Sequence, residues 1–105
     1  MKLLSIEYVP GQEIEALGLV KGTIVQTKNV GRDIMAGMKT LVGGEIAGYT
    51  QMLNEARQIA TKRMVDEAKE LGADAIIGIT YGSSQVMAGA AEVVADGTAV
   101  KYKNS

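Results

Sequence analysis

Residues 49–81, which read YTQMLNEARQIATKRMVDEAKELGADAIIGITY, decide the fold of this chain. Apolar residues recur at the helical period through most of this stretch and form one broad stripe, which comprises Met52, Leu53, Ala56, Ile59, Ala60, Met64, Ala68 and Leu71. Gly72 follows at the position where a left-handed residue ends a helix. Residues 75–81 are then rich in β-branched side chains. The stretch therefore predicts a helix over residues 49–71 and a buried strand after it.

Further strands are predicted on both sides of this unit. Residues 2–9 alternate loosely in polarity and end at a Pro-Gly turn signal, which predicts a short strand. Residues 13–28 form a longer extended stretch with apolar residues on both faces, so we expect it to be covered on both sides. Residues 82–89 indicate a flexible connection to a last strand over residues 91–102. The order β-β-α-β-β predicts one α+β domain over residues 1–105, with a small antiparallel sheet packed on one long helix.

The composition indicates a thin core. The 105 residues include no Phe and no Trp, so the core must be built from aliphatic residues, Met and Ala, each of which buries less area than a large ring. Thirteen glycines add conformational entropy that folding must overcome. Association with further copies is a common source of the missing stability. We therefore expect a homo-oligomer.

The charge pattern argues against a nucleic-acid partner, and the hydropathy pattern argues against a membrane partner. The net charge is −1 and the charges of both signs are interspersed, so there is no basic run that could follow a phosphate backbone, and we expect no nucleic-acid partner. No apolar stretch approaches the ~20 residues that span a bilayer, so we expect no membrane partner. The first residues are charged too early and their apolar run is too short for a signal peptide. We expect a cytoplasmic protein.

Two absent residue types restrict the chemistry. Without His or Cys the chain cannot form a Ser-His-Asp triad, a Cys-His pair or a thiolate nucleophile, and it lacks both usual zinc ligands. Neither common phosphate-binding glycine motif is present. Carboxylates, Lys, Tyr and Arg remain, and every globular protein has those. We therefore favour a protein that is not an enzyme.

Three charged residues fall within the apolar stripe of the predicted helix: Arg57, Arg63 and Glu67. Arg63 and Glu67 are four residues apart and so are neighbours on the helix surface. One interpretation is that these charges contact a ligand or another subunit. The alternative is that their stems cover apolar surface while their charged ends reach water.

A second set of candidates lies in the segment between strand and helix. Asn29, Arg32 and Asp33 combine an amide, a guanidinium and a carboxylate that could bind a small anion or act as an acid–base group. A helix cap with a neighbouring salt bridge explains them equally well. Met35 and Met38 could present two thioethers to a soft ion such as Cu(I), or they could fill gaps in a core. A metal ion is therefore the one cofactor that we consider.

In order along the chain, several short motifs resemble the YbjQ family of uncharacterised bacterial and archaeal proteins. They are GLVKG at residues 18–22, NVGRD at 29–33, Gly43-Gly44, Tyr49, Ala56-Arg57, Ala60, LGADAIIG at 71–78 and GTAV at 97–100. The resemblance covers nearly the whole chain. It implies an α+β subunit similar in fold to dodecin subunits, assembled into a ring, with five copies the favoured number. The family is catalogued as heavy-metal-binding and has no established activity.

Three functional hypotheses follow. The leading one is a non-enzymatic oligomeric module that binds a small ligand, ion or partner between its subunits. The second is a heavy-metal-binding protein that uses Met35 and Met38 or carboxylates repeated by symmetry. The third is an enzyme in which the region of Arg32 and Asp33 acts with Tyr49 or Arg57.

Overall fold

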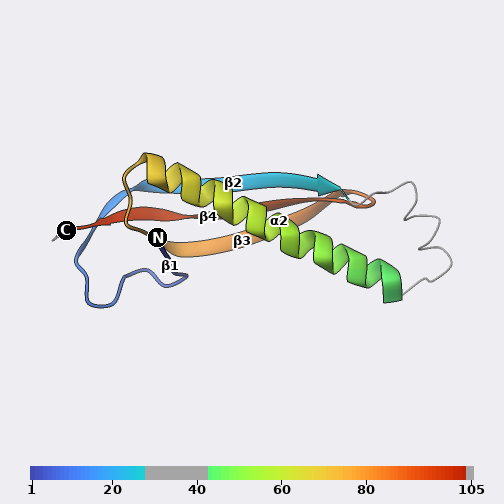
Figure 1. The fold of residues 1–105 in the computed structure, drawn as a ribbon, viewed down its shortest axis with the longest axis horizontal. Coiled ribbons are helices and arrows are strands. Elements are labelled where there is room, and N and C mark those ends of the chain that lie inside the picture. Colours follow the sequence, from blue (N-terminus) through green and yellow to red (C-terminus); the bar gives the residue numbers. More distant parts are fainter. Residues whose placement is uncertain (28–42, 104–105) are drawn as a thin grey trace.

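The computed structural model describes residues 1–27 and 43–103, with side chains from residue 48 onward in the second range. The elements in these ranges are β1 (Lys2–Leu3), β2 (Ile14–Thr27), α2 (Gly43–Glu70), β3 (Ala75–Met87) and β4 (Ala90–Tyr102). The described strands form a sheet of order β1-β3-β4-β2, and α2 crosses one face of it (Figure 1). The predicted α+β class and element order are confirmed. The sheet is mixed and not purely antiparallel as predicted, because β1 runs parallel to β3.

Helix α2 is longer than the apolar stripe predicts. It begins at Gly43 instead of residue 49 and ends at Glu70. Glycine is a poor helix former, and the glycines at 43, 44 and 48 conceal the first turns from sequence analysis. The predicted end is confirmed, since Gly72 has φ 77° and its N–H donates to the Lys69 carbonyl at 3.0 Å. The N–H of Ala73 donates to the Ala68 carbonyl at 3.1 Å, which completes a Schellman motif.

The main core lies between α2 and the sheet. On the helix side it contains Ala56, Ala60, Met64 and Ala68, and on the sheet side Val20, Ile76, Val93, Ala95 and Ala99. Met52 is buried as predicted. Leu71, which the sequence placed in the same stripe, is 48% exposed. It follows the last helical residue, so its side chain no longer continues the helical stripe.

Small residues allow α2 to approach the sheet closely. Alanines dominate the buried helix face, and Gly22 of β2 lies directly beneath the helix backbone. A Cβ atom added at Gly22 would lie 2.0 Å from the Ala60 carbonyl oxygen. Glycine is therefore required at this position, because any side chain would meet helix backbone.

The N-terminal segment covers one end of the opposite sheet face. Val9 is buried there against Ala75, Ile77 and Val100. The predicted strand over residues 2–9 is wrong beyond Leu3. Beyond Leu3 the segment keeps only separate backbone hydrogen bonds to β3, at Leu4 and Ile6, before it crosses the sheet end to bury Val9.

Strand β3 extends further than predicted. The segment 82–89, expected to be a flexible connection, contributes residues up to Met87 to β3, and these pair with β4. Hydrogen bonding to β4 holds this Gly- and Ser-containing sequence extended despite its weak strand propensity. The hairpin projects beyond the N-terminal segment and exposes all of its residues from Thr80 to Met87.

Beyond Ile14, which packs against the cluster around Val9, the described residues of this chain cover mainly one face of strand β2. Val20 is buried under α2 and Ile24 packs against the same core. On the other face, Leu19 is 83% exposed and Val25 is 55% exposed. The sequence predicted that both faces of this strand are covered, but the described residues of one chain leave Leu19 and Val25 uncovered.

Candidate functional site

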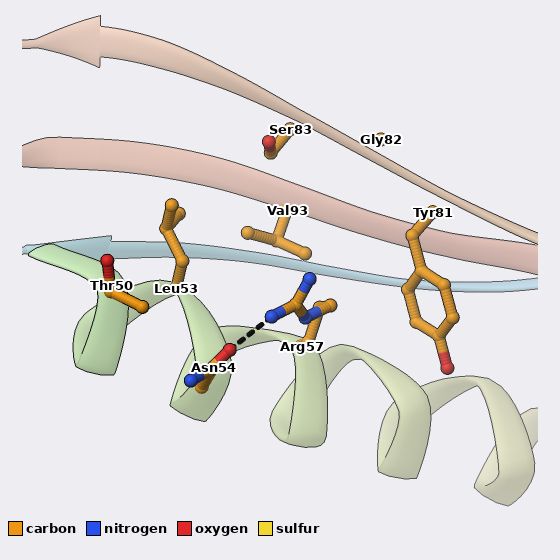
Figure 2. A pocket seen from close by; sticks show the side chains of 8 residues that line it. All are labelled: Thr50, Leu53, Asn54, Arg57, Tyr81, Gly82, Ser83 and Val93. Atoms are coloured by element: carbon orange, nitrogen blue, oxygen red, sulfur yellow. Dashed lines mark hydrogen bonds between the residues drawn. The ribbon is translucent and has the colours of Figure 1, made fainter.

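A groove lies between α2 and β3, because α2 packs mainly over β2 and β4 and touches β3 little. Its volume is about 200 Å³. The described lining residues come from three elements: Thr50, Leu53, Asn54 and Arg57 from α2, Tyr81, Gly82 and Ser83 from β3, and Val93 from β4 (Figure 2). The groove thus combines an apolar base with polar groups at its sides.

Arg57 and Tyr81 face the groove from opposite elements. In Figure 2 the Arg57 side chain rises from α2 toward the strands, and the Tyr81 ring descends from β3 toward the helix. The guanidinium donates a hydrogen bond from Nη2 to Oδ1 of Asn54, three residues earlier on the same helix. Arg57 is exposed, and this bond orients its guanidinium beside the groove.

A hydrogen-bond chain ties β3 to α2 beside the groove. The Thr61 hydroxyl donates to the Arg57 carbonyl at 2.7 Å and lies 2.8 Å from the Tyr81 hydroxyl. Thr61 has a single hydroxyl proton and gives it to the carbonyl, so the Tyr81 hydroxyl is the donor in the second bond. The proton of Tyr81 is therefore committed to Thr61, and Tyr81 offers the groove its ring and an acceptor oxygen.

The other two charged residues of the helix stripe reach the backbone of β2. Arg63 Nη1 donates to the Thr23 carbonyl at 2.7 Å. Glu67 Oε1 accepts from the Lys21 N–H at 3.1 Å. Because β2 is the outer strand on this side of the described sheet, these bonds satisfy edge groups that would otherwise be unpaired. Arg63 and Glu67 thus lie at the edge of β2, while Arg57 lies at the groove.

Of the remaining predicted candidates, none that the structure describes lines the groove. Tyr49 is half-buried on α2 and is not part of the groove lining. Asn29, Arg32, Asp33, Met35 and Met38 lie outside the described residues.

The β3 side of the groove was not evident from the sequence pattern. Ser83 and Gly82 were placed in a flexible segment, and Tyr81 at the end of a strand. A period of two from Tyr81 to Ser83 was the available signal, because it places both side chains on the face toward α2. Asn54 was missed because nothing in a helical pattern distinguishes a groove-facing amide from a solvated one.

The described residues do not fit a heavy-metal site. The sequence has no His and no Cys, and within the described ranges no three Asp or Glu residues gather as metal ligands. Met52 and Met64 are buried in the core, where their sulfur atoms pack against apolar neighbours. Soft metals need several thiolate, imidazole or accessible thioether donors together. The exposed thioethers among the described residues are those of Met1 and Met87, which lie toward opposite ends of β3 and do not form such a set.

Fold and groove together define a small α+β domain with a groove of about 200 Å³ on one side of its helix. In the part of the chain that the structure describes, no helix combines the length and hydrophobicity needed to cross a membrane. The chain belongs to the YbjQ family, whose description is "Putative heavy-metal-binding" and whose pattern matches residues 1–103.

Curated relatives from several bacteria are similar over nearly their full length. A UPF0145 protein of Helicobacter hepaticus is 61% identical, over 96% of this chain and 97% of its own. UPF0145 proteins of Clostridium novyi and Thermotoga maritima are each 58% identical, over 96% and 98% of this chain and 98% of their own. None of these names states an activity.

A crystal structure supports the fold. A protein of unknown function of the DUF74 family from Pediococcus pentosaceus matches with a TM-score of 0.64, at 20% sequence identity and over 98% of both chains. At this identity the likeness concerns the fold alone.

Proposed function

We propose that the protein is a cytoplasmic, non-enzymatic homo-oligomer that binds a small ligand or ion between its subunits, and that the oligomer is a ring of five. The observation that carries the association is the outer edge of β3. From Thr80 to Met87 every residue is exposed, none is charged, and β1 pairs only with Ala75 and Ile76 at the other end of the strand. Among the described residues, nothing pairs with the outer backbone of this segment.

The edge of β2 and the part of the β3 edge that β1 leaves free differ in a way that favours β3 as the contact. Natural proteins protect free edges with charges, prolines or covering elements. At β2, Arg63 and Glu67 reach over the edge and bind its backbone. At β3, the pairing with β4 is regular from Thr80 to Gln85 and no such protection is present among the described residues. An uncharged, regular edge of this kind is suited to receive a strand from another chain.

The occupant we propose is a second copy. The subunit is elongated, with extents of 59 × 22 × 17 Å and a Cα radius of gyration of 17.3 Å, against about 13 Å for a compact chain of this length. Val86 and Met87 on the hairpin and Leu19 and Val25 on the uncovered face expose apolar surface that a neighbouring copy would bury. A closed ring requires that the β3 edge meet a different surface of the next copy. The number five rests on the family resemblance.

The ligand half of the proposal rests on the position of the groove. Tyr81, Gly82 and Ser83 form both the β3 side of the groove and part of the free edge. A copy that pairs with this edge extends the sheet and adds an outer wall to the groove. The ligand would then be enclosed only in the assembled form.

Native mass spectrometry and light scattering test the association. We expect a mass of about 55 kDa for five subunits of 11.0 kDa each. Val86→Lys places a charge on the β3 hairpin and should release subunits, whereas Leu71→Lys changes a similarly exposed side chain at the helix end and should leave the mass unchanged. A wild-type mass of one subunit at micromolar concentration would refute the association.

Heavy-metal binding is the second candidate function, and the family description favours it. The donors of the described residues oppose it, which leaves Met35, Met38 or a carboxylate repeated around a symmetry axis. We expect no Cu(I), Zn²⁺ or Cd²⁺ bound more tightly than about micromolar. A stoichiometric nanomolar site in calorimetric titration, abolished by Met35→Leu with Met38→Leu, would establish the metal function instead.

A further inference from the structure

We propose that the groove between α2 and β3 binds a small organic carboxylate, with the carboxylate on Arg57 and an apolar body against Leu53 and Val93. This inference deepens the proposed function, because it rests on the same groove and names the chemical class of its ligand. Figure 2 shows the arrangement: Leu53 and Val93 lie beside the guanidinium, and Ser83 lies above them on β3.

The charge of the groove selects an anion. Among its described lining residues, Arg57 carries the only charge. No carboxylate of the described residues lies within ion-pairing distance of this guanidinium. The ion pair on the same helix joins two other residues, Lys62 and Asp66. Asn54 accepts one of the five guanidinium N–H donors, and the described residues leave the rest of the fork available. A carboxylate matches that fork with two parallel hydrogen bonds.

The other groups of the groove favour a monocarboxylate over a phosphate. Phosphate sites in proteins usually collect several basic side chains or a run of backbone N–H groups at a helix N-terminus. Here one guanidinium is joined by the hydroxyls of Thr50 and Ser83. Tyr81 does not add a donor, because its proton is given to Thr61.

The apolar surfaces define the rest of the ligand. Val93 is buried at the base of the groove and Leu53 is half-buried beside it. The Tyr81 ring, fixed by its bond to Thr61 at 2.8 Å, closes one end. A flat ring or short branched chain attached to the carboxylate would cover these groups and displace water from them. A volume of about 200 Å³ suits a molecule of one ring.

Benzoate is the probe for this site, and benzamide is its uncharged isostere. We expect benzoate to shift the methyl NMR signals of Leu53 and Val93 at millimolar concentration, and benzamide to bind at least tenfold more weakly. Arg57→Gln should weaken benzoate at least tenfold. Lys69→Gln is the matched control: it removes the same charge from the same helix, far from the groove lining, and should leave benzoate binding unchanged.

Several outcomes would overturn the inference: no shift at either methyl group, equal binding of benzoate and benzamide, or unchanged binding by Arg57→Gln. Inorganic phosphate binding as well as benzoate would overturn the apolar part, because phosphate has no body to place on Leu53 and Val93. The mass of the same samples separates this inference from the oligomer proposal. A single-subunit mass with intact benzoate shifts refutes only the oligomer, whereas a ring mass without shifts refutes only the carboxylate site.

Discussion

The close approach of α2 to β2 makes Gly22 the position where the smallest change has the largest effect. In Gly22→Ala the new Cβ would lie 2.0 Å from the Ala60 carbonyl oxygen and 2.6 Å from the Met64 nitrogen. Both atoms are helix backbone, so no side-chain rotation relieves the contact. Restoring ordinary contact, which begins at 3.4 Å, requires the helix to recede by about 1.4 Å along the first of these lines.

The cost of this displacement has two parts. Overpacking of a well-packed core costs about 1–3 kcal/mol, and a contact with rigid backbone belongs at the upper end of that range. A receding helix also lengthens the bonds from Arg63 to Thr23, now 2.7 Å, and from Lys21 to Glu67, now 3.1 Å. We expect Gly22→Ala to reduce the free energy of unfolding by about 3 kcal/mol.

Urea denaturation followed by far-UV circular dichroism measures this loss, at one fixed protein concentration because association contributes to stability. Gly82→Ala is the matched control. It makes the same change in β3, where an added Cβ meets nothing within 4 Å in the same chain, and in samples whose mass matches the wild type it should alter stability by less than about 0.5 kcal/mol. If Gly22→Ala were as stable as Gly82→Ala, the packing of α2 on β2 described above would be wrong.

Two further predictions concern other parts of the helix. Ala60→Asp buries an unpaired carboxylate in the core and should unfold or disassemble the protein, at a cost of several kcal/mol. An unchanged melting temperature and mass would contradict the placement of Ala60 on the buried face of α2. The pKa of Asp66 is lowered, chiefly by its hydrogen bond from Lys62 at 2.8 Å, so NMR titration of Lys62→Met should return that pKa toward its ordinary value. A carboxyl group whose pKa is lowered by folding stabilises the fold at pH values above its unfolded-state pKa, so this small contribution should be lost as the pH falls through the acidic range. A pKa of Asp66 that Lys62→Met leaves unchanged would refute Lys62 as the cause of the shift.

The sequence predicted the helix, its end and the element order because each depends on local signals. The stripe through Ala56, Ala60 and Met64 has the helical period, and Gly72 can adopt the left-handed conformation that ends the helix. The extended stretches predicted at residues 13–28 and 91–102 likewise agree with β2 and β4 within a residue or two at each end.

Tertiary structure alone decided where the groove lies and which charges face it. Arg57, Arg63 and Glu67 occupy one stripe in sequence, yet Arg57 lies at the groove beside β3 and the other two bind the backbone of β2. The difference arises from the position of α2 over the sheet, which the contact with Gly22 fixes and no helical period encodes.

The same reason explains the misplaced hairpin. Residues 82–87 have the composition of a loop, and they are held as a strand by hydrogen bonds to β4, which follows them in sequence. Local propensity determined the helix, β2, β4 and the first part of β3. Pairing between segments determined the second part of β3, residues 82–87, and with it the free edge and the β3 side of the groove, because a strand of weak propensity exists only where a neighbour completes its hydrogen bonds.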